Sequence, residues 1–287
     1  HPTTSTKSVK ISATNFTFRH KKETAIFNKN IILNTDNLTI KSEIINYNKN
    51  KDTLNFQKGF TLLNNVSTTN AKTAFLNIND SLILASNNIH SIYNKKATKN
   101  ESFQIKELLK YPTHIKSNHL TLSYKNNQNP IIKYKNNVTI EQKNKSLHSD
   151  HVVIDTNSDQ YYAEGNVILK FDELLWGINP KKTISNKTIK EMIKSPITIN
   201  SSTATFLKNK NELHLEGKIK IKQKNYKITC NKLIYELDNQ LIIFLDEVTV
   251  YKFGLKYLSS DQLILNITNE SLITNSKNSL SEIKLEI

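Results

Sequence analysis

The sequence has few of the residues that build thiol or metal sites and few of those that interrupt strands. It contains one cysteine, Cys230, which excludes an intramolecular disulfide and a thiolate metal site. Only five glycines and five prolines punctuate the 287 residues. There is no run of about 18 apolar residues, so we expect no segment of the sequence to cross a bilayer as a helix.

Acidic residues are also in short supply. Lysine and arginine number 40 against 25 aspartates and glutamates, for a formal charge of +15 and a pI near 9.6. This predicts an anionic partner, such as a membrane surface or a phosphorylated lipid or sugar. Arg19 is the only arginine, and lysine lacks the bidentate fork that reads base edges, so no nucleic-acid partner is expected. Richness in Lys, Asn and Ile is equally typical of an A+T-rich genome, which limits the charge to an argument about solubility and steering.

What the chain does contain is a repeat of alternating apolar and polar residues. Leu213–Ile221, Ile132–Ile140 and Leu54–Leu62 each alternate with the period of a strand that has one buried face. The last apolar residue of the shared core recurs in steps of 29 within each of three groups. These positions are Ile31, Phe60 and Ile89, then Val138 and Val167, then Ile219 and Val248.

A second mark is a small residue, often followed three and five positions later by larger apolar ones. The small residues are Ala13, Ser42, Ala71, Ser117, Ser149, Ser201, Cys230 and Ser260. Each unit is therefore a strand, a polar turn and another strand, which is a β-hairpin. Eight copies predict about sixteen strands, the eighth being degenerate beyond Leu265, and the copies must stack because a lone hairpin is marginal in water.

Two stretches interrupt the repeat and resemble each other. Ile105–Pro112 and Ile189–Pro196 both place apolar residues at helical spacing before a proline, which predicts a short amphipathic helix in each. They either cap one end of a groove or act as a gate or docking element. We expect one domain over residues 9–287, after a flexible N-terminus at 1–8. It comprises hairpin blocks 9–93, 114–171 and 197–287, with helical inserts at 94–113 and 172–196.

No constellation of residues points to catalysis. The eight histidines fall mostly at turns or strand exteriors and form no ligand set. Ser149, Asp150 and His151 have the residue types of a catalytic triad, but neighbours on a strand point to opposite faces. We expect a protein that is not an enzyme and has no cofactor and no metal.

The repeat resembles the OstA-like family of lipopolysaccharide transport. The strongest copy is Tyr162–Leu169, where the phrase Gly165-Asn166-Val167 is complete, and the resemblance runs from Ala13 to roughly Leu265. The phrase is partial at Gly217-Lys218-Ile219 and shifted at Gly59-Phe60. Other copies carry Lys29, Lys58, Asn87, Asn136 or Asp246 where the glycine belongs. The family includes a periplasmic bridge protein (LptA-like), the periplasmic domain of its inner-membrane partner (LptC-like) and the N-terminal domain of the outer-membrane assembly protein (LptD-like).

The resemblance implies an all-β, elongated, half-open and twisted β-jellyroll of stacked antiparallel hairpins. It also implies a non-catalytic periplasmic carrier or bridge, its signal peptide removed, that shields the acyl chains of lipopolysaccharide or a similar glycolipid in a hydrophobic groove. Inward residues would cover lipid tails at about 0.8 kcal/mol per buried methylene. The alternative at every position is an ordinary core residue. The candidate groove residues are Ile45, Tyr47, Phe56, Phe60, Leu120, Leu122, Tyr134, Val138, Val152, Ile154, Val167, Leu215, Ile219, Leu233, Tyr235, Phe244 and Val248.

An open stack also leaves strand edges that another chain can extend. We expect partners among other jellyroll proteins of the bridge, or further copies of this chain joined head to tail. The predicted docking edges are Phe16 and Phe18 at one end, and Leu263–Leu265 or Ile283–Ile287 at the other. Two other classes of protein stay open: a β-solenoid adhesin or carbohydrate-binding surface protein, built from parallel coils, and a scaffold without a ligand.

Overall fold

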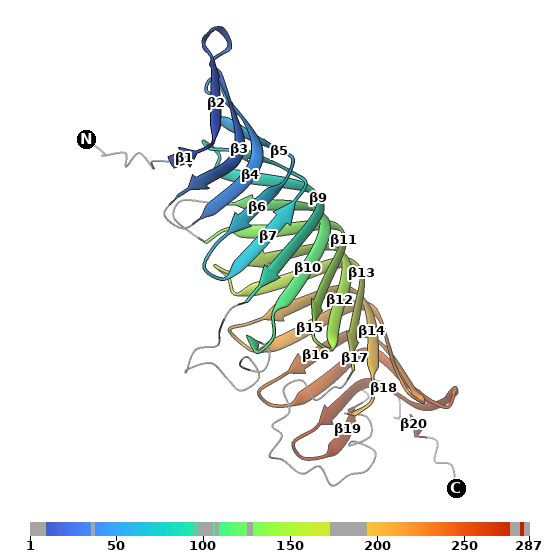
Figure 1. Cartoon of the computed structure of the whole chain (residues 1–287). Helices are drawn as coiled ribbons and strands as arrows, with labels where there is room; N and C mark the ends of the chain where they lie inside the picture. The colour runs from blue at the N-terminus through green and yellow to red at the C-terminus, as the bar shows by residue number, and fades with distance from the viewer. Residues whose placement is uncertain are drawn as a thin grey trace, which may run out of the picture. The chain divides into compact units, whose positions relative to one another are not determined.

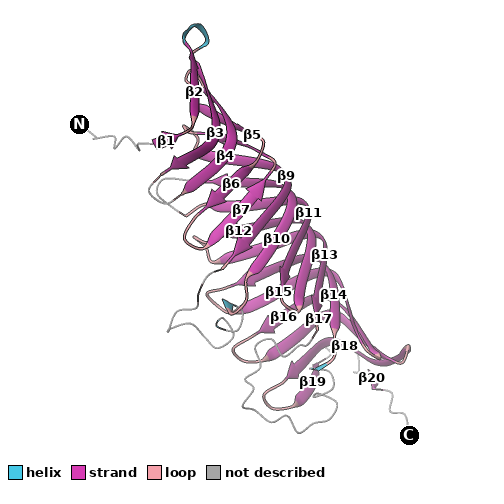
Figure 2. Ribbon diagram, in the orientation of Figure 1, coloured by secondary structure: helices cyan, strands magenta, loops and turns pink. Residues whose placement is uncertain are grey.

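The structure, a computed structural model, is all-β and jellyroll-like, as the repeat predicted (Figures 1 and 2). It describes residues 10–35, 38–94, 96, 106, 109–124, 129–172, 194–275 and 282–283. No helix in this described part is long and apolar enough to cross a membrane. Of the two predicted inserts, most residues lie outside the described part. Lys106, Leu109 and Lys194 are described and helical, and strand β10 begins at Thr113.

The chain forms two compact units. The first comprises residues 1–95 and 113–137, and the second comprises 96–112 and 138–287. The first unit contains β1 (Lys10–Ser12), β2 (Asn15–Arg19), the 3-10 turn η1 (His20–Lys22), β3 (Thr24–Asn34), β4 (Thr39–Asn48), β5 (Thr53–Gln57), β6 (Phe60–Leu63), β7 (Ser67–Ala71), β8 (Thr73–Asn77), β9 (Leu82–Tyr93) and β10 (Thr113–Ser123). The second contains β12 (Lys145–Asp155), β13 (Gln160–Phe171), β14 (Ile197–Leu207), β15 (Glu212–Gln223), β16 (Tyr226–Glu236), β17 (Leu241–Lys252), β18 (Leu255–Asn266), β19 (Ser271–Asn275) and β20 (Glu282–Ile283). The boundary between the units falls inside β11 (Ile131–Gln142).

Within each unit, strands that follow one another along the chain pair antiparallel, from β12 with β13 through to β18 with β19. Antiparallel neighbours confirm the hairpins and contradict the parallel coils of a β-solenoid. The short pieces β5 with β6 and β7 with β8 are each one strand broken at its middle, and β1 with β2 and β19 with β20 are interrupted likewise. Counted in this way, the described strands number sixteen, as predicted.

Every second strand is sharply bent at its middle, where two successive residues adopt a left-handed backbone. In β15 these are Gly217 (φ 84°) and Lys218 (φ 46°), and the strand pairing shifts register at the same place. The corresponding pairs are Lys29-Asn30, Lys58-Gly59, Asn87-Asn88, Asn136-Asn137, Gly165-Asn166 and Asp246-Glu247. The glycine-containing phrase of the repeat is therefore a β-bulge.

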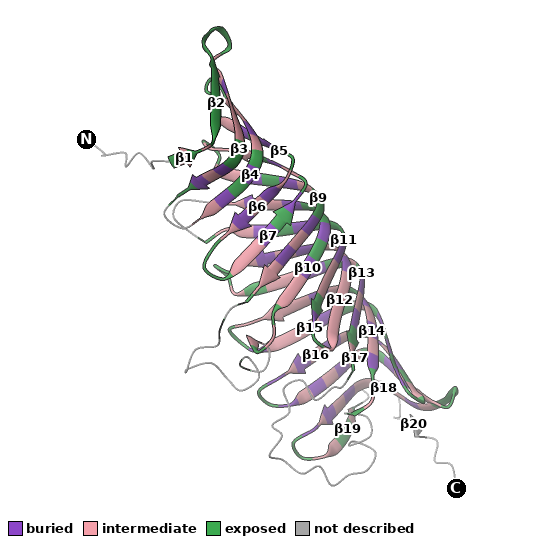
Figure 3. Ribbon diagram, in the orientation of Figure 1, coloured by how far each residue is buried: buried purple, intermediate pink, exposed green. Residues whose placement is uncertain are grey.

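The bulge in β5–β6 bends its strand sharply. Phe56 and Phe60 lie on either side of the Lys58-Gly59 bulge, and their ring centroids are 5.3 Å apart in an edge-to-face contact. Four residues of straight strand would separate them by about 13 Å. Each long strand therefore has two arms whose inner faces oppose one another, and buried residues alternate with exposed ones along both (Figure 3).

The small residue of the repeat lies directly opposite the bulge. Ser201 pairs with Val167, Cys230 with Ile219, and Ser260 with Val248. The serine hydroxyls donate to the carbonyl two residues further along their own strand, as from Ser201 Oγ to the oxygen of Thr203 at 3.0 Å and from Ser260 Oγ to that of Gln262 at 2.8 Å. A small side chain fits the concave side of the bend, and its hydroxyl hydrogen-bonds a local carbonyl.

Cys230 occupies this serine position, and its thiol should be inert in the folded protein. Burial raises the pKa of Cys230 to about 12, against the smaller opposing effect of backbone hydrogen bonds involving Leu245 and Lys232. At pH 8 we expect a disulfide reagent to label the thiol only after denaturant unfolds the chain. We expect Cys230→Ser to keep the native unfolding midpoint, whereas Cys230→Leu should lower stability by about 2 kcal/mol because the bend has no room. Fast labelling of the native protein would contradict this assignment.

One predicted docking edge is wrong. Leu263 and Leu265 are buried in β18, whose segment Gln262–Asn266 pairs with β17 on one side and β19 on the other. The degenerate last repeat suggests the end of the sheet, but β19 continues it, with Leu272 opposite Leu265. In β20, Ile283 pairs with Leu258, and residues 284–287 lie outside the described part.

Candidate functional site

The candidate groove residues face the interior between the two arms. All of the seventeen except Tyr47 are buried. Tyr47 is half-buried, with its hydroxyl 3.4 Å from Asp52 Oδ1. Burial, followed by the nearby Asp52 carboxylate, raises the Tyr47 pKa. Alternation therefore predicted the inward direction of these side chains, which pack as the core of the two-armed stack.

In the second unit, the bulges divide the strands into two sets of segments, which we name the first arm and the second arm. The first arm consists of residues 151–155, 160–164, 203–207, 212–216, 232–236, 241–245 and 262–266, and the second of residues 145–148, 167–171, 197–200, 219–223, 226–229, 248–252 and 255–260. The arms meet at the bulges. The interior is therefore bordered on its far side by the two rows of strand ends, which we call the rims.

The rim of the first arm is an unbroken apolar row. Register places one apolar side chain per strand side by side, from β12 to β19, and these side chains face inward on β12–β18. In order they are Ile154, Tyr161, Phe206, Leu213, Tyr235, Ile242, Leu265 and Leu272. Tyr161, Phe206 and Leu213 are only half-buried, and the rings of Tyr161 and Phe206 lie 6.0 Å apart. Burial raises the pKa of Tyr161, so its hydroxyl stays neutral.

The rim of the second arm is mixed in character. Gln223 pairs with Tyr226, which pairs with Lys252, which pairs with Leu255. Lys145 pairs with Phe171 further along the same rim. The interior of the second unit thus lies between an apolar rim and one that carries ammonium and amide groups.

Two glutamines at this rim hold the ends of the two inserts. Gln142 Nε2 donates to the carbonyl of Tyr111 at 3.0 Å, and Gln223 Nε2 donates to the carbonyl of Ser195 at 3.1 Å. Both acceptors immediately precede a proline, and both glutamines are buried. The likeness of the two inserts in sequence therefore extends to an identical attachment.

In the first unit, a polar bridge joins the two arms. The hydroxyls of Tyr134, before the bulge of β11, and Tyr93, after the bulge of β9, lie 2.8 Å apart. Burial raises the pKa of Tyr134 to about 12, against the lowering effect of hydrogen bonds with Ser91 and Tyr93. Ser91 is also hydrogen-bonded to the buried Thr69 at 2.8 Å. These hydroxyls satisfy one another in the interior, where an unpaired one would be costly.

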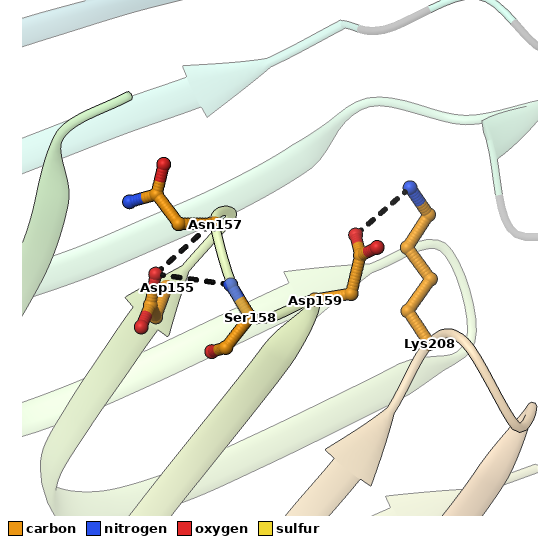
Figure 4. A network of polar contacts seen from close by, with 5 residues as sticks. All are labelled: Asp155, Asn157, Ser158, Asp159 and Lys208. Carbon is orange, nitrogen blue, oxygen red and sulfur yellow. Dashed lines mark hydrogen bonds and ion pairs between the residues drawn. The ribbon is translucent and has the colours of Figure 1, made fainter. Parts of the chain in front are cut away.

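The turns beside the first-arm rim are fastened to one another. The amide of Lys208, between β14 and β15, donates to the carbonyl of Asp159, between β12 and β13, and the two side chains are 3.4 Å apart (Figure 4). In the earlier turn, Asp155 accepts from the amides of Asn157 and Ser158. Hydrogen bonds from Ser158 and Asn157 lower the Asp155 pKa. These contacts fix the spacing of the rim strands.

The described residues contain no cluster of three or more His, Cys, Asp or Glu side chains arranged to hold a metal ion. His90 Nε2 and His114 Nδ1 are 3.2 Å apart, which makes them a hydrogen-bonded pair. Ser149 Oγ donates to the carbonyl of His151, so it has the structural role of the other small residues. The predicted set included two residues of the first-arm rim, Ile154 and Tyr235, but not their neighbours Tyr161, Phe206 and Leu213. Each lies two positions outside a buried inward residue, a signal that was present in the alternation.

Part of the chain matches a known protein family. Residues 114–241 match the family described as LptA/(LptD N-terminal domain) LPS transport protein. No curated protein matches this chain. Among solved structures, it is similar to LptH from Pseudomonas aeruginosa, described as the LptA-homologous periplasmic component of the lipopolysaccharide transport device. The sequence identity is 14%, the match covers 48% of this chain and 84% of LptH, and the TM-score is 0.35.

Proposed function

We propose that this chain is a non-catalytic periplasmic carrier of the OstA-like lipopolysaccharide-transport family that shields acyl chains between its two arms. The family match over residues 114–241 supports this proposal. The single observation that supports this best is the apolar first-arm rim. It would give an acyl chain a continuous apolar surface across β12–β18 of the second unit.

The two rims differ in a way that suits an amphipathic ligand. Tails placed along the first-arm rim would leave water at about 0.8 kcal/mol per buried methylene, which offsets their removal from a membrane. Phosphates and sugars would lie towards Lys145 and Lys252 on the opposite rim. The fully buried candidates, such as Leu215 and Val248, then form the floor that supports the rim.

Site-specific photo-crosslinking tests this placement. A photoreactive phenylalanine analogue at Phe206 should crosslink to lipopolysaccharide in cells, because its side chain is half-buried on the inner face of the rim. The matched control is position 205. Thr205 is the next residue on β14, and its side chain points to the opposite face. Equal labelling at both positions, or none at 206, would contradict a ligand between the arms.

The substitution Phe206→Asp adds a quantitative test. Phe206 is not in the fully buried core, so we expect the variant to fold. It should retain at least tenfold less lipid after purification, because a carboxylate replaces acyl contact. Organic extraction followed by mass spectrometry measures the lipid, and Thr205→Asp is the control. If neither the parent protein nor any variant yields an amphiphile, the remaining proposal is a scaffold without a ligand.

We also propose a route for assembly with other jellyroll chains of the bridge, or with copies of this one. In the described residues, β1 and β2 pair with β3 alone, and β19 pairs with β18 alone. Both are therefore edges with backbone groups available for strand addition.

A further inference from the structure

The turn between β17 and β18 carries an exposed apolar tip. Phe253 and Leu255 are each 64% exposed, the highest values among large hydrophobic side chains in the described residues. The turns at the same end of the neighbouring hairpins are polar, Lys143-Asn144 between β11 and β12 and Lys224-Asn225 between β15 and β16. The apolar character thus belongs to this tip and not to the repeat.

Phe253 is also costly for the backbone. It has φ 50° and is followed by Gly254 at φ 82°, the left-handed pair of a type I′ turn. Asparagine is the residue such a turn prefers before glycine, and other L-residues there cost about 1–2 kcal/mol. The amide of Phe253 is held by the carbonyl of Asn225 at 2.9 Å, so the tip is fixed to the neighbouring turn. Folding therefore explains neither the exposed ring nor its place in the turn.

A row of lysines lies beside the tip on the outer face of the second arm. Register places Lys222 opposite Lys227, Lys227 opposite Tyr251, and Tyr251 opposite Lys256. Like charges directly across a strand pair are destabilising. The three lysines are exposed, and the ion pairs found among described residues involve none of them. Lys227 Nζ lies 5.1 Å from the centroid of the Tyr251 ring, which keeps its charge at the surface.

We propose that this hairpin tip docks on the surface of an anionic lipid bilayer, with Phe253 and Leu255 in the acyl boundary and the lysine row at the headgroup phosphates. An aromatic and a leucine flanked by lysines is the composition that binds the membrane interface. Charge complementarity favours anionic lipid over an uncharged surface. A soluble phosphate would use the lysines and leave the two apolar side chains in water. This inference does not depend on lipid between the arms.

The binding free energies expected from the lysines and from Phe253 set the size of the effect on vesicle binding. A lysine near an anionic membrane contributes about 1 kcal/mol, or about fivefold in binding. Burying part of a phenylalanine ring contributes about 1.4 kcal/mol, or about tenfold. The full-length chain should therefore co-sediment with vesicles of phosphatidylcholine and phosphatidylglycerol, bind vesicles of phosphatidylcholine alone much less, and lose the difference at high salt.

Two variants separate the apolar and charged contributions. Phe253→Asn should reduce vesicle binding about tenfold while raising the unfolding temperature, because Asn-Gly suits the turn. A loss of binding with a gain in stability cannot come from misfolding. Lys227→Gln with Lys256→Gln should reduce binding about 25-fold. Lys41→Gln with Lys51→Gln removes the same charge from exposed sites in the first unit. This control should change vesicle binding less than either test variant does.

Three outcomes would overturn the proposal. The first is equal binding of the parent protein and Phe253→Asn. The second is equal loss in the Lys41/Lys51 control, which would indicate net charge alone. The third is release of the protein from vesicles by inorganic phosphate at constant ionic strength, which would assign the lysines to a free anion. If vesicle binding fails but position 206 crosslinks to lipid, the groove proposal stands and the docking proposal falls. If position 206 does not crosslink but vesicle binding behaves as expected, the docking proposal stands alone.

Discussion

Gly217→Ala should destabilise the protein by about 3 kcal/mol, far more than the same change at Gly59. A Cβ at position 217 would lie 2.5 Å from Ser202 Oγ and 2.7 Å from Ser202 Cβ on the neighbouring strand. The second of these contacts is close to the backbone and cannot be relieved by rotating a side chain. Left-handed strain at φ 84° contributes about 1 kcal/mol and the steric overlap about 2 kcal/mol.

Gly59 is the control. It is the second residue of its bulge pair at φ 96°, whereas Gly217 is the first, and a methyl group added to Gly59 would meet no atom within 4 Å. Gly59→Ala should therefore cost only the strain, about 1 kcal/mol. Denaturant unfolding followed by circular dichroism measures both. Adding Ser202→Gly to Gly217→Ala should restore about 2 kcal/mol, since it removes the overlapping atoms. Equal costs at the two glycines would mean that strain alone matters at the bulge.

The repeat predicted the sheet because its signal is local. A period of two residues gives the buried face of a strand, and the 29-residue step gives the hairpin. Both were confirmed, as was the resemblance. The bends were harder to foresee at Lys29-Asn30 and Asp246-Glu247, because those pairs contain no glycine. Asn30 and Asp246 are residue types that adopt a left-handed backbone fairly often, but Lys29 and Glu247 are not, although they adopt it here as well.

The two sequence marks of the repeat also carry the strand register. Ile219 and Cys230 are 11 residues apart, and so are Phe60 and Ala71, and the structure makes both couples direct cross-strand partners. Pairing the marks around the polar turn would have fixed the register and located the bend. Counting from the last core position of the repeat also identifies the two glutamines that hold the inserts. Gln142 and Gln223 follow the last core position by four residues, in hairpins of the blocks that begin after each insert.

Alternation predicted which residues point inward but not how deep they lie. Leu215 and Leu213 have the same parity on β15, yet Leu215 is fully buried and Leu213 is half-buried. Distance from the bulge alone does not set the depth, because Tyr235, which pairs with Leu213 on the same rim, is only 4% exposed. The candidate set therefore contained mainly the floor of the interior. Locating the rim, where we propose that a ligand makes contact, requires the position of the bend.

Charged substitutions at the two strand edges should abolish association with partner jellyrolls. Phe16 and Phe18 are 59% and 45% exposed on β2, and Leu272 and Ile273 are each 54% exposed on β19. A carboxylate on an edge strand opposes the addition of another strand, because pairing would bury it beside the partner backbone. We expect Phe16→Asp with Phe18→Asp, or Leu272→Asp with Ile273→Asp, to remove partner pull-down and any self-association.

Mixing the two variants distinguishes head-to-tail joining from other contacts. Each variant keeps one intact edge, so an equimolar mixture should form a dimer through the single pair of edges that remains, and nothing longer. Analytical ultracentrifugation measures the species present. Phe75→Asp is the control, because Phe75 is exposed on β8, which pairs with both β5 and β9, and we expect it to leave association unchanged. Association that persists in both edge variants, or a mixture that stays monomeric when the parent protein associates, would contradict edge-to-edge assembly.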